Sequence, residues 1–364
     1  MNTSNLPMVL RSREALVATV TESRLPVTPS GTTYTMAQEA SFLSNDYYAV
    51  GRWDGTLSIF QFTDSSDKGP IVAKAVNSPA QEGVQMITPL ANFKSAFVSS
   101  NDESSMVVWA SQNGDWSDLT SVATLAYADA YGVANRGVTV SINSYTYLVV
   151  GHANGYVSIW RSGAVVTDWK FVTATDVRSS TPVNPWGLHN IRGIVQFGAL
   201  GIVITGSEDG NLTVLEIPSG RILSATVFNP RAQRGINNIA IERDVLLVVN
   251  CSVGKDDYNL WSYKVNSTTW EITSVDKSYL KIDPDAIQVF NFDVLVGLPQ
   301  IDKTAFFSST EEGVLWFGTV DRNGGITTSG NDIIGDGDLG SALCMSDTRL
   351  AVTSYNLHQY GYNP

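Results

Sequence analysis

The chain has 364 residues, of which 43% are hydrophobic and only 16% are charged, and its formal net charge is −12. An acidic protein is repelled by phosphate backbones and by anionic lipid surfaces, so this charge argues against general nucleic-acid binding. No stretch approaches the roughly 18 consecutive apolar residues of a membrane span, and residues 1–13 lack the apolar run of a signal peptide. We therefore expect no membrane span and a cytoplasmic location.

One short pattern recurs along the chain. An apolar run ends in a small residue, a polar turn follows, and a second apolar run begins. Asp-Gly, Asn-Gly or Glu-Gly occupies the clearest turns, where glycine adopts positive φ at low cost, so each copy predicts a β-hairpin. The copies lie near residues 47–60, 95–109, 147–160, 201–215, 245–265, 305–317 and 350–361.

Strand-like runs also flank these hairpins. Such runs precede the hairpins at 137–142, 194–197 and 236–241, and follow them at 164–173 and 221–228. Each repeat then reads as four strands in about 40 to 60 residues, the length of a propeller blade with its loops. The sequence predicts an all-β chain in which residues 1–364 form a single seven-bladed β-propeller of four-stranded antiparallel blades.

The hairpin pattern resembles the second-to-third strand hairpin of WD-repeat blades. Residues 147–160 carry it as a small residue, Asn-Gly, a β-run and a final Trp. The terminal Trp-Asp pair of that family is absent, since Ala110 follows Trp109 and Arg161 follows Trp160. The resemblance implies a degenerate WD-repeat-like propeller and, as the usual role of that family, an assembly platform.

The last repeat stops too early for a fourth strand. We expect the N-terminal run at residues 15–20 to complete that blade, because closure joins the chain ends and removes an exposed sheet edge.

Three repeats begin with Arg-Gly-apolar, at Arg136, Arg192 and Arg234. Equivalent positions on neighbouring blades lie side by side around the axis, so three guanidiniums would line one arc near the channel mouth. Arginine suits carboxylates, which predicts a site for an acidic peptide or other anion. The alternative is a structural role in which each Arg pairs with a turn acid such as Glu208 or Asp209.

Three further residues are candidates for partner binding on the same face. Trp53 and His152 fall in predicted hairpin turns, and Trp186 falls in a predicted loop. Exposed Trp and Arg are enriched at binding hot spots, whereas packing beneath a loop is the structural alternative.

No catalytic motif, phosphate-binding loop or metal-ligand spacing occurs in the sequence, so we expect no cofactor and no metal. The leading hypothesis is a non-enzymatic scaffold that binds a protein or acidic peptide. This partner could belong to a larger assembly. Two alternatives stay open. One is a structural or receptor- or glycan-binding component of an extracellular or virion assembly, and the other is a lyase or glycosidase with acids at the channel mouth.

Overall fold

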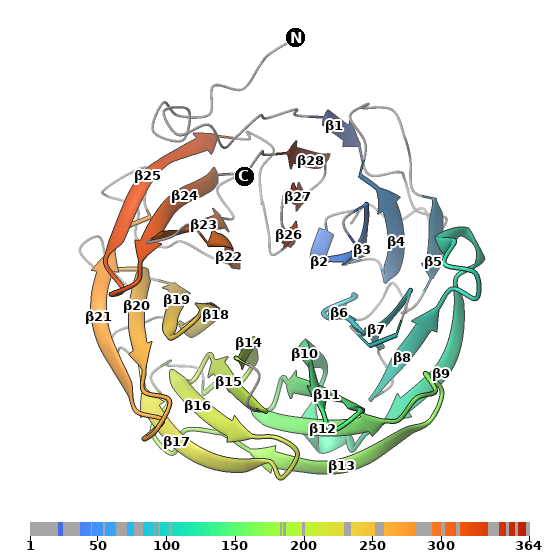
Figure 1. The fold of residues 1–364 in the computed structure, drawn as a ribbon, viewed down its shortest axis with the longest axis horizontal. Helices are drawn as coiled ribbons and strands as arrows, with labels where there is room; N and C mark the ends of the chain where they lie inside the picture. Colours follow the sequence, from blue (N-terminus) through green and yellow to red (C-terminus); the bar gives the residue numbers. More distant parts are fainter. Residues whose placement is uncertain are drawn as a thin grey trace.

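The computed structural model shows a ring of β-sheets around a central axis (Figure 1). The structure describes residues 21–24, 37–44, 46–53, 55–62, 71–75, 83–90, 92–93, 95–101, 104–182, 184, 187–198, 201–228, 234–251, 258–280, 293–299, 303–310, 314–333, 342–346, 349–353 and 356–361. Across these residues the strands form seven four-stranded antiparallel sheets, the blades of a β-propeller.

Blade 1 comprises β2 (Ala37–Ser44), β3 (Tyr47–Arg52), β4 (Thr56–Gln61) and β5 (Val72–Ala75). Blade 2 comprises β6 (Ile87–Pro89), β7 (Ala96–Asn101), β8 (Ser105–Ala110) and β9 (Thr120–Ala126). Blade 3 comprises β10 (Ala134–Ile142), β11 (Tyr145–His152), β12 (Tyr156–Ser162) and β13 (Trp169–Asp176). Short 3-10 helices, η1 (Trp116–Asp118) and η2 (Asp129–Tyr131), flank β9.

Blade 4 comprises β14 (Ile191–Phe197), β15 (Ile202–Ser207), β16 (Asn211–Glu216) and β17 (Arg221–Val227). Blade 5 comprises β18 (Arg234–Glu242), β19 (Val245–Cys251), β20 (Leu260–Val265) and β21 (Ile272–Ser278). Blade 6 comprises β22 (Asp293–Pro299), β23 (Lys303–Thr310), β24 (Val314–Asp321) and β25 (Ile326–Ile333). The closing blade comprises β26 (Ala342–Ser346), β27 (Arg349–Thr353), β28 (Asn356–Gly361) and β1 (Thr21–Arg24).

The turns that sequence reasoning used as signals have the expected backbone. Gly55, Gly155 and Gly210 lie in the second-to-third strand turns of blades 1, 3 and 4, with φ of 79°, 75° and 84°. A side chain at these positions would be strained, which explains the Asp-Gly and Asn-Gly pairs. The assignment of the whole chain to one domain stays a prediction.

The core lies between the blades. Every residue of β15 is buried, whereas no residue of the outermost strand β13 is buried. Between blades 3 and 4, Val149 and Ile159 pack with Ile191, Val203 and Leu215 in one apolar cluster. A middle strand is covered by a neighbouring blade on each face, so it carries a continuous apolar run rather than an alternating one.

An N-terminal strand completes the closing blade, but not the one expected. Residues Thr21–Arg24 form β1, which pairs antiparallel with β28 so that Thr21 faces Gln359 and Arg24 faces Asn356. The apolar run at 15–20 lies outside the described residues. An outermost strand needs few buried side chains, as β13 shows, so a polar segment can form the fourth strand of the closing blade.

Candidate binding face

The second-to-third strand turns and the starts of the innermost strands lie on one side of the propeller, which we call the hairpin face. The strand register shows this, because the first residues of each innermost strand pair with the last residues of the second strand. The pairs are Arg136 with Gly151, Ile191 with Ser207, and Arg234 with Cys251. The three Arg-Gly pairs therefore share a face with the hairpin turns.

Arg136 is held across three blades. Its Nη1 lies 2.7 Å from Glu39 Oε2 on β2, and it also donates to the carbonyl oxygens of Gln85 at 3.0 Å and Asn135 at 2.9 Å. Only 14% of either charged side chain is exposed. Arg136 ties blade 3 to blades 1 and 2, and its charge is compensated within the fold.

Arg192 pairs with a turn acid, as the structural alternative predicted. Its Nε donates to Glu208 Oε1 at 2.8 Å, and the Glu208 side chain is fully buried. Asn190 Nδ2 donates to the other carboxylate oxygen at 2.8 Å, and Asn135 Nδ2 of blade 3 reaches Asn190 Oδ1 at 3.4 Å. The Arg192 side chain keeps 26% of its surface exposed. Arg234 begins β18, and its side chain lies outside the described part of the chain.

The glycine after each arginine has a steric reason. A Cβ on Gly193 would lie 2.7 Å from the Ile239 backbone nitrogen of blade 5, closer than real contacts allow. A Cβ on Gly235 would collide with the Gly210 backbone of blade 4. At Arg136 and Arg192 the Arg-Gly signature combines an ion pair within the fold with close backbone packing against another blade, which supports the structural reading of the arginine arc.

Asp209 organises the blade 4 turn. Its Oδ2 accepts from Ser179 N at 2.7 Å and pairs with His189 Nδ1 at 2.9 Å, while Oδ1 accepts from Asn211 N at 3.1 Å and from the Ser207 hydroxyl. The Asp209 side chain is fully buried, and both of its oxygens are engaged twice. A buried carboxylate satisfied in this way orders a turn.

His152 is a core residue rather than part of an exposed turn. It ends β11 and is fully buried. Its Nδ1 lies 3.2 Å from the Gly132 carbonyl, which only accepts, so Nδ1 carries the proton. Its Nε2 then accepts from the Ser158 hydroxyl at 2.7 Å, and Trp160 Nε1 donates to the same hydroxyl oxygen at 3.1 Å. Burial lowers the pKa of His152 from 6.5 to about 4, so the ring is neutral at pH 7.

Beside these buried groups lies a surface that the sequence did not reveal. We call it the tyrosine–arginine patch: Tyr131, Tyr156, Asp176 and Arg178. The two tyrosine rings stack at 4.8 Å, and the Arg178 guanidinium lies 5.2 Å from the centre of the Tyr156 ring. Arg178 donates to both Asp176 oxygens, at 2.9 and 2.5 Å. That contact holds the pKa of Asp176 below its usual value and raises the pKa of Arg178.

The patch is ordered and accessible. The Arg178 and Asp176 side chains are 43% and 44% exposed, and the tyrosines are half-buried. Three segments far apart in sequence supply these residues: η2, the start of β12 and the end of β13. No local pattern links them, which is why sequence reasoning missed the patch.

The remaining candidates have different outcomes. Trp53 lies in the β3–β4 turn with 36% of its surface exposed, so a partner on the hairpin face can reach it. Trp186 lies outside the described residues. The roles of both in binding stay predictions.

Within the described ranges, no group of three or more His, Cys, Asp or Glu residues is placed to hold a metal ion. In the same part of the chain, no helix has the length and apolar character needed to cross a membrane.

Comparison with known proteins gives the fold alone. No protein-family model matches the chain, and no curated protein matches it. Among solved structures, the chain is similar to the β-propeller domain of Cps50 (Swd1) from Myceliophteria thermophila, with a TM-score of 0.60 and 12% identity over 90% of this chain and 99% of that one. Because 1501 chains of solved structures match, the propeller cannot by itself fix a function.

Proposed function

We propose that the chain is a non-enzymatic protein- or peptide-binding module whose partner docks on the hairpin face. The tyrosine–arginine patch carries this proposal. Tyrosine and arginine are enriched at interface hot spots, because they combine large contact area with hydrogen-bonding groups. Tyr131, Tyr156 and Arg178 are already fixed by stacking and by the Asp176 ion pair, so binding costs little further side-chain entropy.

The partner's charge follows from the paired arginines. Arg192 uses Nε for Glu208, and its side chain keeps 26% of its surface exposed. One acidic side chain or chain end of a partner fits there. A broadly acidic partner does not fit, because Arg136 is already neutralised by Glu39 and the chain carries a net charge of −12.

The state of the buried acids supports a non-enzymatic module. Glu208 and Asp209 are acids of the blade 4 turn on the hairpin face, and both are fully buried. Arg192 and Asn190 occupy the Glu208 oxygens, and His189 with three further donors occupies those of Asp209. General acid–base chemistry requires a carboxyl group that can reach the substrate, so neither residue supports the lyase or glycosidase alternative.

The test is an affinity capture from the native source with three baits. The first is the wild type, and the second carries Tyr156→Ala and Arg178→Ala. The third carries Tyr145→Ala and Arg161→Ala, which removes a matching arginine-over-tyrosine contact of 4.7 Å from the opposite face of the same blade. We expect a partner retained by the first and third baits and lost by the second. Equal capture by all three baits would rule out the patch.

A second candidate function has its own observation. The outermost strands of three consecutive blades expose large apolar side chains: Phe171 on β13 at 48%, Ile222 on β17 at 43% and Val275 on β21 at 44%. Exposed apolar groups of this kind suit a structural component of a larger assembly. Two measurements test this: light scattering of the purified chain, and detection of the chain in purified particles. A strictly monomeric protein that is absent from the particles would exclude the assembly role.

A further inference from the structure

The junctions between neighbouring blades have the same three parts on the side opposite the hairpin face. The parts are the turn after one blade's innermost strand, the start of the next blade's second strand, and the turn before that blade's outermost strand. Between blades 3 and 4, Ile142 fills this position and packs against Gly201. Between blades 4 and 5, Phe197 and Trp270 fill it with an edge-on ring contact of 5.8 Å.

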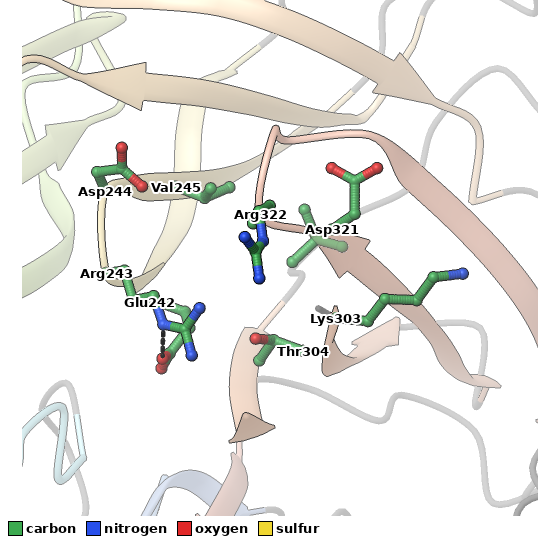
Figure 2. A pocket seen from close by; sticks show the side chains of 9 residues that line it. Glu242, Arg243, Asp244, Val245, Lys303, Thr304, Asp321 and Arg322 are labelled. Carbon is green, nitrogen blue, oxygen red and sulfur yellow. Dashed lines mark ion pairs between the residues drawn. The ribbon is translucent and has the colours of Figure 1, made fainter. Parts of the chain in front are cut away.

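The junction between blades 5 and 6 is closed by charged groups. Figure 2 shows side chains from the two blades converging around a cavity of about 20 Å³, enough for about one water molecule. The charged residues that line it are Glu242, Arg243, Asp244, Lys303, Asp321 and Arg322. Asp244 and Lys264 are paired there at 2.7 Å. This junction has no room for a ligand.

The junction between blades 1 and 2 differs in size and in chemistry. It holds a cavity of about 360 Å³, which we call the junction pocket. Ten described residues line it: Leu43, Ser44, Tyr47, Pro89, Leu90, Phe93, Ser95, Ala96, Gly114 and Trp116. None of these ten carries a charge. The volume falls within the range of about 300 to 1,000 Å³ that is usual for small-molecule sites.

The turn after the innermost strand of blade 2 forms one wall of the pocket. The strand β6 has three residues and ends at Pro89, and beyond it the Leu90 N–H still donates to the Ala96 carbonyl at 3.0 Å. The chain then turns, so that Leu90 and Phe93 line the pocket. Trp116 lies between the third and fourth strands of blade 2, as Trp270 does in blade 5, where it fills the junction. The Trp116 ring lies 5.9 Å from Phe97 in the blade core, with only 3% exposed, and the space stays unfilled.

The walls of the pocket are fixed without a ligand. Trp116 opens η1, where the Asp115 side chain caps the turn by accepting from Ser117 N at 2.9 Å. Phe93 closes a turn with its N–H on the Leu90 carbonyl at 2.8 Å. Its ring lies 6.3 Å from Trp169 of blade 3. A preformed site of this kind loses little entropy on binding.

We propose that the junction pocket binds an uncharged small molecule that contains an aromatic ring. Tyr47, Phe93 and Trp116 contribute atoms to a largely apolar lining, and the hydroxyls of Ser44 and Ser95 can supply hydrogen bonds at its edge. A charged ligand would lose its hydration without gaining a counter-ion from the described lining. The site is on the side opposite the tyrosine–arginine patch, so it stands independently of the proposed protein partner.

Indole is the probe for this site, because it is an uncharged ring with one hydrogen-bond donor. Binding to the intact chain is measured by ligand-observed NMR titration, and we expect a saturable dissociation constant on the order of 0.1 to 1 mM. Ser44→Phe places a ring in the mouth of the pocket from an exposed position, and Tyr47→Ala removes a wall. Each variant should weaken binding at least about tenfold. Ser274→Phe, the same substitution at an exposed site on β21, should leave binding unchanged.

The ligand's charge preference and the existence of the site are tested separately. Indole-3-carboxylate, the charged relative, should bind at least about tenfold more weakly than indole. Equal binding of the two ligands would overturn the preference for an uncharged group. The absence of saturable indole binding by the wild type, or wild-type affinity in folded Ser44→Phe and Tyr47→Ala, would overturn the site itself.

Discussion

Acidification from pH 7 to pH 5 is expected to destabilise the fold through His152. The ring is fully buried and neutral, with its Nδ1 proton on the Gly132 carbonyl and its Nε2 on the Ser158 hydroxyl. Protonation of Nε2 would remove the acceptor that Ser158 needs and would place a charge in the blade 3 core. The folded chain therefore resists a proton that the unfolded chain accepts.

The size of the effect follows from the pKa of His152, which burial lowers from 6.5 to about 4. Because the unfolded state binds the proton first, the contribution to stability is fully present above pH 6.5 and is lost as the pH falls toward 4. The shift corresponds to about 3 kcal/mol in total, of which about 2 kcal/mol is lost by pH 5.

The assay is urea unfolding of the wild type and of His152→Asn at pH 7, 6 and 5. Asparagine keeps a donor near the Gly132 carbonyl but does not titrate, so this variant is less stable at pH 7. The difference in unfolding free energy should shrink by about 2 kcal/mol between pH 7 and pH 5. His189 and His358 are present in both proteins, so their contributions cancel. A difference that stays constant across this pH range would refute the assigned burial and tautomer.

Three further predictions concern the blade contacts. Arg192→Met should lower stability by about 3 kcal/mol, because it removes the cation from a fully buried carboxylate of the blade 4 turn. Arg221→Met, at an exposed ion pair, should leave the thermal midpoint unchanged, and equal midpoints for the two variants would contradict the structural role of Arg192. Gly193→Ala should cost about 1 to 3 kcal/mol by chemical denaturation, and Gly163→Ala, with open space around its added Cβ, should cost nothing measurable. Deletion of residues 1–24 should lower the melting temperature by several degrees, since it uncovers the outer edge of β28, and an unchanged melt would exclude closure by β1.

The fold was predictable wherever a local pattern carries the physics. The hairpin expected near 147–160 is formed by β11 and β12, because two apolar runs flank an Asn-Gly turn. The closing strand was placed wrongly, on the apolar run at 15–20, because an outermost strand needs little burial and so leaves no hydrophobic signal. Thr21–Arg24 carry polar side chains and pair with β28 in the antiparallel ladder.

The candidate site was predictable only in part. Pairing of each Arg-Gly arginine with a turn acid was one of the two alternatives, and Arg192 makes such a pair with Glu208. Arg136 of blade 3 pairs with Glu39 on β2 of blade 1, two blades away in the chain. No spacing in the sequence encodes this contact. The same holds for Tyr131, Tyr156 and Arg178, which three separate segments bring together.

The central claim is that a protein partner docks on the hairpin face, and amide hydrogen exchange of the captured complex tests it most directly. We expect binding to slow exchange at residues 129–132, 153–156 and 176–179, which surround the tyrosine–arginine patch. Exchange at the opposite turns of the same blade, residues 142–145 and 163–168, should not change. Protection confined to those opposite turns, or to the outer strands β13, β17 and β21, would rule out docking on the hairpin face.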